Sequence, residues 1–197
     1  MTRSEEIIQA MSNHSIMIQA MFSDVKLVED IERAALIIAE CIREDGTVLI
    51  FGNGGSAADS QHFAAELVGR FALERRGLSA LALSTDTSVL TSLANDYGFE
   101  EIFARQVEAL GRKGGVAVPI STSGNSPNVL RAIDAAHKKG MNVIGLTGGD
   151  GGSMRTSCDL AIVVPSAETP RIQEGHALIY HILCGLVEKD VCGGKKF

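Results

Sequence analysis

Hydroxyl and amide side chains gather in the segment Ser121–Ser126, which reads Ser-Thr-Ser-Gly-Asn-Ser. It follows the short apolar run Val116–Ile120 and precedes a helix-like pattern over Asn128–Lys139. The first turn of a helix offers unpaired backbone N–H groups and the positive end of the helix dipole to an anion. Hydroxyl groups add donors, and Gly124 lets the backbone approach a ligand closely. The pattern predicts a cradle for a phosphate monoester, with an ordinary Ser/Asn-rich helix cap as the alternative.

A second glycine-rich loop, Gly52–Ser56, follows an earlier apolar run. Together with Ala57 it approximates the fingerprint of dinucleotide-binding proteins. That fingerprint requires an acidic residue about 20 positions further on, at the end of the second strand. The first acidic residue after the second predicted strand is Asp86, which is too distant. We therefore predict no nicotinamide cofactor, and the absence of a GxxxxGK[ST] motif gives no support to a P-loop.

Titratable side chains recur at helical spacing after the first loop. His62, Glu66 and Arg70 stand at i, i+4 and i+8 of a helix predicted over residues 57–70, so they are expected to share one face. Histidine and glutamate one turn apart can bind a divalent metal or act as an acid/base pair. A solvated polar face is the alternative.

The last predicted helix, residues 171–190, carries Gln173, His176 and His181 on an otherwise apolar pattern. A histidine on an apolar face usually belongs to the core. Three of the five histidines nevertheless fall in this helix and in the helix of His62, which favours a functional cluster.

Short apolar runs alternate with helical patterns along most of the chain. The predicted strands are 47–51, 80–84, 116–120, 142–147 and 160–165. The predicted helices are 4–22, 25–44, 57–70, 88–94, 102–110, 128–139 and 171–190. This alternation predicts an α/β/α sandwich of three layers around a five-stranded parallel sheet. A flavodoxin-like order, 2-1-3-4-5, would bring the loops 52–56 and 121–126 together at the topological switch point.

A chain of 197 residues with 45% hydrophobic content is expected to form one domain over 1–197, with leading helices in 1–44 and an α/β core in 45–197. The leading helices carry more apolar residues than one sheet face needs: Ile7, Ile8, Met11, Ile16, Met17, Ile18 and Met21. We expect them to make subunit contacts, with packing on the sheet edge as the alternative. Pro119 removes a ladder donor from the third strand, which puts the bounds of that strand in doubt.

Composition excludes several classes of function. The net charge is −6, and basic residues form nothing larger than pairs such as Arg75-Arg76 and the Lys195-Lys196 tail, so we expect no nucleic-acid partner. No run of eighteen apolar residues predicts a membrane span, and the N-terminus lacks a signal-peptide pattern. The four cysteines are scattered without a CxxC pair, as is typical of reduced thiols in a cytoplasmic protein.

The motifs occur together in one order: Gly52–Ser56, His62-x-x-x-Glu66, Asn95–Gly98, Ser121–Ser126 and Arg171–Glu174. Over about residues 25–192 the chain resembles the SIS (sugar isomerase) family, and within it the bacterial phosphoheptose isomerases. The resemblance implies an aldose–ketose isomerase that converts D-sedoheptulose 7-phosphate to D-glycero-D-manno-heptose 7-phosphate through an enediol(ate). This is the first step toward the heptose of lipopolysaccharide and related glycans. It also implies a homotetramer with active sites at subunit interfaces and one zinc ion per subunit.

The same resemblance assigns roles to individual positions. Glu66 matches the base beside the carbonyl and His181 the complementary acid, whereas Arg70 matches a position near the substrate and His176 receives no role. The zinc site corresponds to His62, Glu66, Gln173 and His181. The substrate contacts correspond to Asn53, Gly54, Gly55, Ser56, Arg70, Asp96, Ser121, Thr122, Ser123, Ser126 and Gln173. Thr169 stands where some relatives carry an acidic residue.

Proton transfer between adjacent carbons needs a base at carbon, a proton donor at oxygen and a group that stabilises the developing negative charge. Zinc supplies such a group as a Lewis acid, although the base and ligand roles then compete for the Glu66 carboxylate. The main alternative is a non-catalytic SIS protein that binds the replication initiator protein. Such proteins keep the cradle but lack the pair that matches Glu66 and His181. A sugar-phosphate-sensing regulatory domain is disfavoured because no DNA-binding module is appended.

Overall fold

The computed structural model describes residues 1–193, so the Lys195-Lys196 tail lies outside the described residues. The helices are α1 (Arg3–Ser23), α2 (Val25–Arg43), α3 (Gly55–Val68), α4 (Thr87–Asp96), the 3₁₀ helix η1 (Phe99–Glu101), α5 (Ala104–Leu110), α6 (Pro127–Lys138), α7 (Met154–Ser157) and α8 (Thr169–Cys192). The strands are β1 (Val48–Gly52), β2 (Ala80–Ala82), β3 (Val116–Ile120), β4 (Asn142–Gly148) and β5 (Leu160–Val164).

The strands form one parallel sheet in the order β2-β1-β3-β4-β5, as the sequence predicts. Every residue of β1 and of β3 is buried, because helices cover both faces of the sheet. The strand order reverses between β1 and β3. The carboxyl ends of these two neighbouring strands therefore open onto the place where ligands bind in such sheets.

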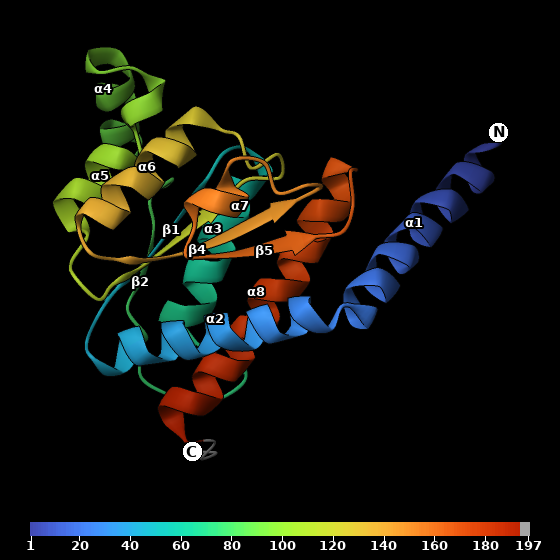
Figure 1. Ribbon diagram of the computed structural model, residues 1–197, viewed down its shortest axis with the longest axis horizontal. Coiled ribbons are helices and arrows are strands. Elements are labelled where there is room, and N and C mark those ends of the chain that lie inside the picture. The colour runs from blue at the N-terminus through green and yellow to red at the C-terminus, as the bar shows by residue number, and fades with distance from the viewer. Residues whose placement is uncertain (194–197) are drawn as a thin grey trace.

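Alternate residues of each strand contribute to two separate cores. Val48 and Ile50 pack in a core with helices α2, α3 and α8, whereas Leu49 and Phe51 pack with helices α5 and α6. Figure 1 shows the sheet between these two helical layers. The three-layer α/β/α arrangement predicted from the sequence is confirmed. No helix within residues 1–193 is long and apolar enough to cross a membrane.

Pro119 lies inside β3. Because proline has no amide hydrogen, one hydrogen bond of the sheet is missing there. The Val116 amide donates to Thr47 on the β1 side, and the Ser121 amide donates to Leu146 on the β4 side. Position 119 therefore faces β4, and the pairing of β3 with β4 passes from Ala117 directly to Ile120. The strand keeps its predicted bounds because its pairing with β1 is complete on the other side.

Helix α1 extends away from the body of the molecule (Figure 1). Only Met17 and Met21 are buried on it, whereas Ile8 and Met11 are 65% and 67% exposed. Three polar contacts attach it to the start of α8: His14 Nδ1 lies 2.7 Å from Glu174 Oε2, Asn13 Nδ2 donates to Glu168 Oε1 at 2.9 Å, and Arg171 Nη1 donates to the Ala10 carbonyl at 2.6 Å. Most of its apolar side chains therefore face solvent in the single chain.

Three local features differ from the sequence prediction. Strand β2 ends at Ala82 rather than at residue 84, because Thr85 Oγ1 bonds back to the Ala82 carbonyl in a turn. Helix α7 and the 3₁₀ helix η1 are too short to leave a periodic pattern in the sequence. These differences leave the sheet order and the two loops at the switch point unchanged.

Candidate active site

Helices α3 and α8 lie against each other and run in the same direction. At the start of the pair, a Cβ atom on Gly55 would collide with the side chain of Gln173. Two turns further along, the Tyr180 hydroxyl lies 3.0 Å from His62 Nδ1, and the Tyr180 ring stacks on Phe63. The two helices thus stay in register along their length, and this register positions the titratable side chains between them.

Three potential metal ligands meet at this contact. His62 Nε2 lies 3.1 Å from Glu66 Oε1 and 3.5 Å from Nε2 of His181. One ligand atom from each residue falls within 4.8 Å of the others. Two imidazoles and a carboxylate at this spacing form a donor set that suits Zn²⁺. The predicted fourth ligand, Gln173, lies two turns earlier, against Gly55.

Tyr180 supports this cluster from the protein interior, where it is 2% exposed. Burial, together with the nearby charges of Asp59 and Glu66, raises the pKa of Tyr180 to about 12. The hydroxyl therefore keeps its proton at neutral pH and serves His62 as a hydrogen-bond partner. Tyr180 was not predicted from the sequence, where a tyrosine in an apolar helix gives no sign of its partner.

The predicted phosphate cradle lies between β3 and α6. Ser121 Oγ and Ser126 Oγ are 3.0 Å apart, so the loop closes on itself at the start of α6. The Ser126 side chain caps no amide of the helix, and its hydroxyl pairs with that of Ser121 instead. Ser121 is buried, Thr122 and Ser126 are half-buried, and Ser123 is exposed. The predicted donors thus lie together in the loop that leads into the N-terminus of α6.

The two glycine-rich loops converge as predicted. Asn53 Nδ2 donates to Asn128 Oδ1 at 2.8 Å, and Asn128 Nδ2 donates back to Asn53 Oδ1 at 2.9 Å. This amide pair joins the loop after β1 to the first turn of α6. Gly54 and Gly55 are exposed beside it, and Ser56 is buried. The structure therefore places α3, which carries His62 and Glu66, directly beside the cradle.

Gly124 and Asn125 hold the cradle against the loop that follows β4. Gly124 has a φ of +64°, and an added Cβ would press on the Gly151 carbonyl and lie 2.9 Å from Thr147 Oγ1. Asn125 Oδ1 accepts hydrogen bonds from the backbone N and the Oγ of Ser153. Asn125 is thus a structural member of the predicted motif, whereas the hydroxyls on either side remain available.

The structure corrects the prediction for Arg70. Helix α3 ends at Val68, and not at residue 70, so Arg70 does not share a helical face with His62 and Glu66. The physical reason is Arg75. Its guanidinium donates hydrogen bonds to the carbonyl oxygens of Glu66, Leu67 and Gly69 at the end of the helix. Arg70 is exposed, with Nε 3.7 Å from Glu74 Oε2.

Asp96 lies apart from the other predicted contacts. It is the last residue of α4, is exposed and accepts a hydrogen bond from Asn95 Nδ2. Figure 1 places α4 at the outer end of its layer, away from α3 and α8. Within this chain, Asp96 is therefore separate from the cluster of His62, Glu66 and His181.

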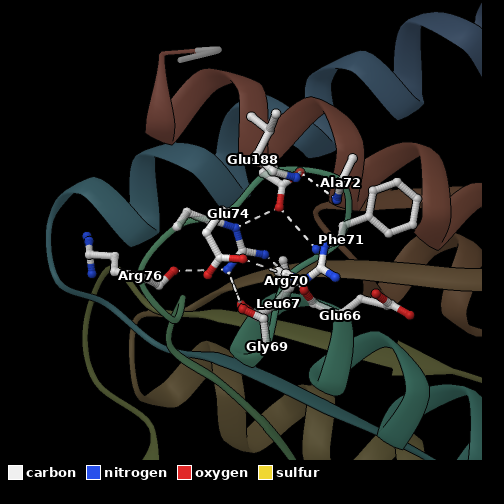
Figure 2. Close-up of polar contacts among 11 residues, drawn as sticks. Glu66, Leu67, Gly69, Arg70, Phe71, Ala72, Glu74, Arg76 and Glu188 are labelled. Carbon is white, nitrogen blue, oxygen red and sulfur yellow. Dashed lines mark hydrogen bonds and ion pairs between the residues drawn. The ribbon is translucent and has the colours of Figure 1, made fainter. Parts of the chain in front are cut away.

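A buried ion pair joins the segment after α3 to α8 (Figure 2). Arg75 Nε lies 2.8 Å from Glu188 Oε1, and both side chains are 1% exposed. Burial opposes the charge on Glu188, but the amides of residues 71–73 and the Arg75 guanidinium outweigh it and lower the pKa of Glu188.

His176 belongs to the core and not to a functional cluster with His62 and His181, which corrects the interpretation drawn from the number of histidines on the two helices. It is fully buried, its Nε2 lies 3.1 Å from the Thr147 carbonyl, and within residues 1–193 its Nδ1 has no hydrogen-bond partner. Burial lowers the pKa of His176 from 6.5 to about 4, although the Thr147 carbonyl opposes the shift. The imidazole is therefore neutral at pH 7 and links α8 to the end of β4.

The five-stranded parallel sheet, with its two polar loops at the switch point, defines the class of this protein as an α/β fold of the SIS-domain type. A family model described as "SIS domain" matches residues 16–148, and the chain belongs to the SIS-domain proteins. The phosphoheptose isomerase of Burkholderia pseudomallei (strain 1710b) is 54% identical over 174 residues, which cover 88% of each chain. That of Helicobacter pylori (strain P12) is 57% identical over 163 residues, 83% of this chain and 85% of the relative.

Solved structures agree with this assignment. The phosphoheptose isomerase of Neisseria gonorrhoeae superposes with a TM-score of 0.89 at 44% identity, covering 95% of this chain and 100% of the other. The enzyme of Francisella tularensis gives a TM-score of 0.90 at 37% identity, covering 96% and 100%. The chain is a member of the phosphoheptose isomerase family.

The buried, neutral His176 makes stability depend on pH. Its pKa of about 4 in the fold lies below the 6.5 of the free side chain, so the unfolded chain binds more protons between these values. The stabilisation is complete above pH 6.5 and is lost as the pH falls toward 4. We expect this residue to contribute about 3 kcal/mol to the loss.

Urea titrations at fixed protein concentration, from pH 7.5 to pH 4.5, measure this effect. His176→Gln keeps a donor for the Thr147 carbonyl but does not titrate, so its free energy of unfolding should fall less steeply than that of the wild type. Equal pH slopes for the two proteins would show that His176 does not carry the effect.

Proposed function

We propose that this protein is an aldose–ketose isomerase that interconverts D-sedoheptulose 7-phosphate and D-glycero-D-manno-heptose 7-phosphate. The reaction would be the first step toward the heptose of lipopolysaccharide or related glycans. The observation that carries the proposal is the placement of Glu66 and His181 beside His62, on helices that start next to the cradle. Membership of the phosphoheptose isomerase family supports it.

The cradle would bind the phosphate and fix the distance to the reacting carbons. Hydroxyls of Ser121, Thr122, Ser123 and Ser126 and the free amides of α6 are suited to a phosphate monoester. Asn53 and Ser56 would hold the sugar chain between the cradle and α3. Binding energy from the remote phosphate thereby orients C1 and C2 toward the base, which is how non-reacting parts of a substrate accelerate a reaction.

Glu66 and His181 would each exchange a proton with the substrate. Glu66 is half-buried on α3, and His181 approaches from α8 on the other side of His62. Glu66 accepts the proton from the carbon beside the carbonyl, and His181 donates a proton to the carbonyl oxygen. The negative charge that develops on the enediolate oxygen is stabilised by hydrogen-bond donors at the same place.

We also propose a zinc ion at this cluster, held by His62, Glu66 and His181, with Gln173 as the fourth ligand implied by the family resemblance. The donor types and the 4.8 Å spacing support it. Zinc bound there would act as a Lewis acid toward the substrate carbonyl. His62 would then be a ligand only, which leaves proton transfer to the other two residues.

A homotetramer is the proposed assembly, with active sites completed by neighbouring subunits. The exposed apolar side chains of α1 support subunit contacts, and His62, Gly54, Gly55 and Arg70 lie exposed in the single chain. The four cysteines are unpaired, which is consistent with the reducing cytoplasm predicted from the sequence. Light scattering tests the assembly: a mass of four chains supports it, and a mass of one chain contradicts it.

The presence of Glu66 and His181 disfavours the non-catalytic alternative. A protein that only binds a sugar phosphate, or the replication initiator protein, needs the cradle and the surface but not a base and an acid. This chain keeps both Glu66 and His181, and they lie together.

Glu66→Gln should strongly reduce turnover and leave substrate binding unchanged. The amide has nearly the same shape but cannot accept the proton, so we expect kcat to fall about 10²- to 10⁴-fold. A coupled assay with sedoheptulose 7-phosphate and added zinc measures it, with Glu108→Gln, an exposed position on α5, as the matched control. Full turnover by Glu66→Gln would refute the mechanism.

His62→Ala should lose the bound metal. Metal analysis of purified wild-type protein is expected to give zinc close to one equivalent per chain, and the variant should retain little. His137→Ala, a surface position on α6, is the control and should keep its zinc. Metal-free wild-type protein with full activity would contradict a catalytic zinc ion.

A further inference from the structure

The segment 69–77, which leaves α3 and leads toward β2, is anchored to α8 by charged groups that solvent does not reach. Arg75 and Glu188 form its centre, 2.8 Å apart. Figure 2 shows Glu188 on α8 beside Phe71 and Ala72 of this segment. We call this pair the Arg75–Glu188 clamp, and the function proposed above leaves it without a role.

Arg75 satisfies the open end of α3. Its Nη2 donates to the Glu66 carbonyl at 2.9 Å, and its Nη1 donates to the carbonyls of Leu67 and Gly69 at 2.9 and 3.1 Å. A helix end leaves its last carbonyl groups without partners inside the helix. One guanidinium thus ends α3 directly after the residue that supplies the predicted base.

Glu188 binds the other part of the segment. Its carboxylate accepts hydrogen bonds from the amides of Phe71, Ala72 and Leu73 at 3.1, 2.9 and 2.8 Å. Both of its carboxylate oxygens accept hydrogen bonds, and the donors are this short stretch of backbone and the Arg75 side chain. The conformation of this stretch, and so the direction of the Phe71 side chain, depends on that carboxylate.

Phe71 connects the clamp to the active site. Its ring stacks on the His181 imidazole, with centroids 5.7 Å apart and an angle of 26° between the planes. The ring also lies over Gly185, where an added Cβ would be 3.5 Å from it. Glu188 follows His181 by two helical turns on the same side of α8. The clamp therefore acts on both helices that supply the cluster.

We propose that Arg75, Glu188 and Phe71 are positioning residues for the active site. The clamp fixes α3 to α8, and Phe71 holds the imidazole of His181 toward His62 and Glu66. This inference rests on the function proposed above for those three side chains. Its physical basis is that a site built from two helices loses its geometry when one helix slides or one ligand rotates.

The clamp fixes a backbone path as well as joining two charges. A buried ion pair is costly to desolvate, and an apolar pair of similar volume often gives equal or greater stability. An apolar pair would leave the three amides bound by Glu188 and the carbonyls bound by Arg75 without partners. The charged pair thus specifies one backbone path, and that path directs Phe71 onto His181.

The test compares Glu188→Gln and Phe71→Leu with the control Leu73→Ala, which truncates a side chain of the same segment without touching the stacked ring. Zinc affinity is measured by competition with a chromophoric chelator, and folding by circular dichroism. We expect zinc to bind about 10- to 100-fold more weakly to the first two variants, as for other supporting residues of metal ligands. The control should match the wild type.

Two further readouts separate positioning from general damage. We expect kcat to fall in Glu188→Gln and Phe71→Leu while KM stays within about twofold, because the phosphate cradle lies on β3 and α6. In metal-free protein, the ¹⁵N resonances of the His181 imidazole should shift in both variants and stay unchanged in Leu73→Ala.

Folded variants with wild-type zinc affinity, kcat and His181 resonances would overturn the proposal. If Glu188→Gln does not fold, Phe71→Leu decides, because it leaves the ion pair intact. If the wild type itself neither binds zinc nor turns over substrate, the proposed function fails. The His181 resonances of the metal-free proteins then still decide whether the clamp and Phe71 position that ring.

Discussion

The active site depends on one constraint, the register between helices α3 and α8. His62 on α3 contacts Tyr180 and His181 on α8, while Glu66 reaches the same imidazole from one turn further along α3. A shift of one helix past the other would separate these groups, since each donor is fixed to its own helix. Gln173 beside Gly55 at one end and the Arg75–Glu188 clamp at the other show that the register is held along the whole contact.

Binding and chemistry reside on different elements, and the sheet brings them together. The proposed cradle follows β3, whereas the proposed base, Glu66, and acid, His181, lie on α3 and α8. Strands β1 and β3 are neighbours at the switch point, so α3 starts beside the cradle, and the Asn53–Asn128 amide pair ties the two loops together. Within residues 1–193, the loop 121–126 makes no hydrogen bond with Glu66 or His181, so binding in the proposed cradle would not itself require those two side chains.

Local patterns in the sequence were sufficient for most of the fold. Apolar runs predicted the five strands, the flavodoxin-like order assumed for them agrees with the sheet, and the Ser121–Ser126 motif predicted the loop at the start of α6. Patterns of this kind do not reveal partners that are distant in the chain. The end of α3 was placed two residues late because Arg75 caps it from outside the helix, and Tyr180 and Asn128 were missed because their roles follow from tertiary contacts. His176 and His181 look alike in the sequence, yet one is buried in the core and the other lies beside His62.

The central claim is that Glu66 and His181 move a proton between adjacent carbons of a sugar phosphate held in the cradle. Isomerisation of sedoheptulose 7-phosphate in deuterium oxide, followed by NMR, tests it most directly. A proton taken from C1 by a carboxylate can exchange with solvent before a proton is returned at C2. The account predicts an aldose heptose 7-phosphate that carries deuterium at C2. Absence of product, or a deuterated product formed at the full wild-type rate by Glu66→Gln, would contradict it.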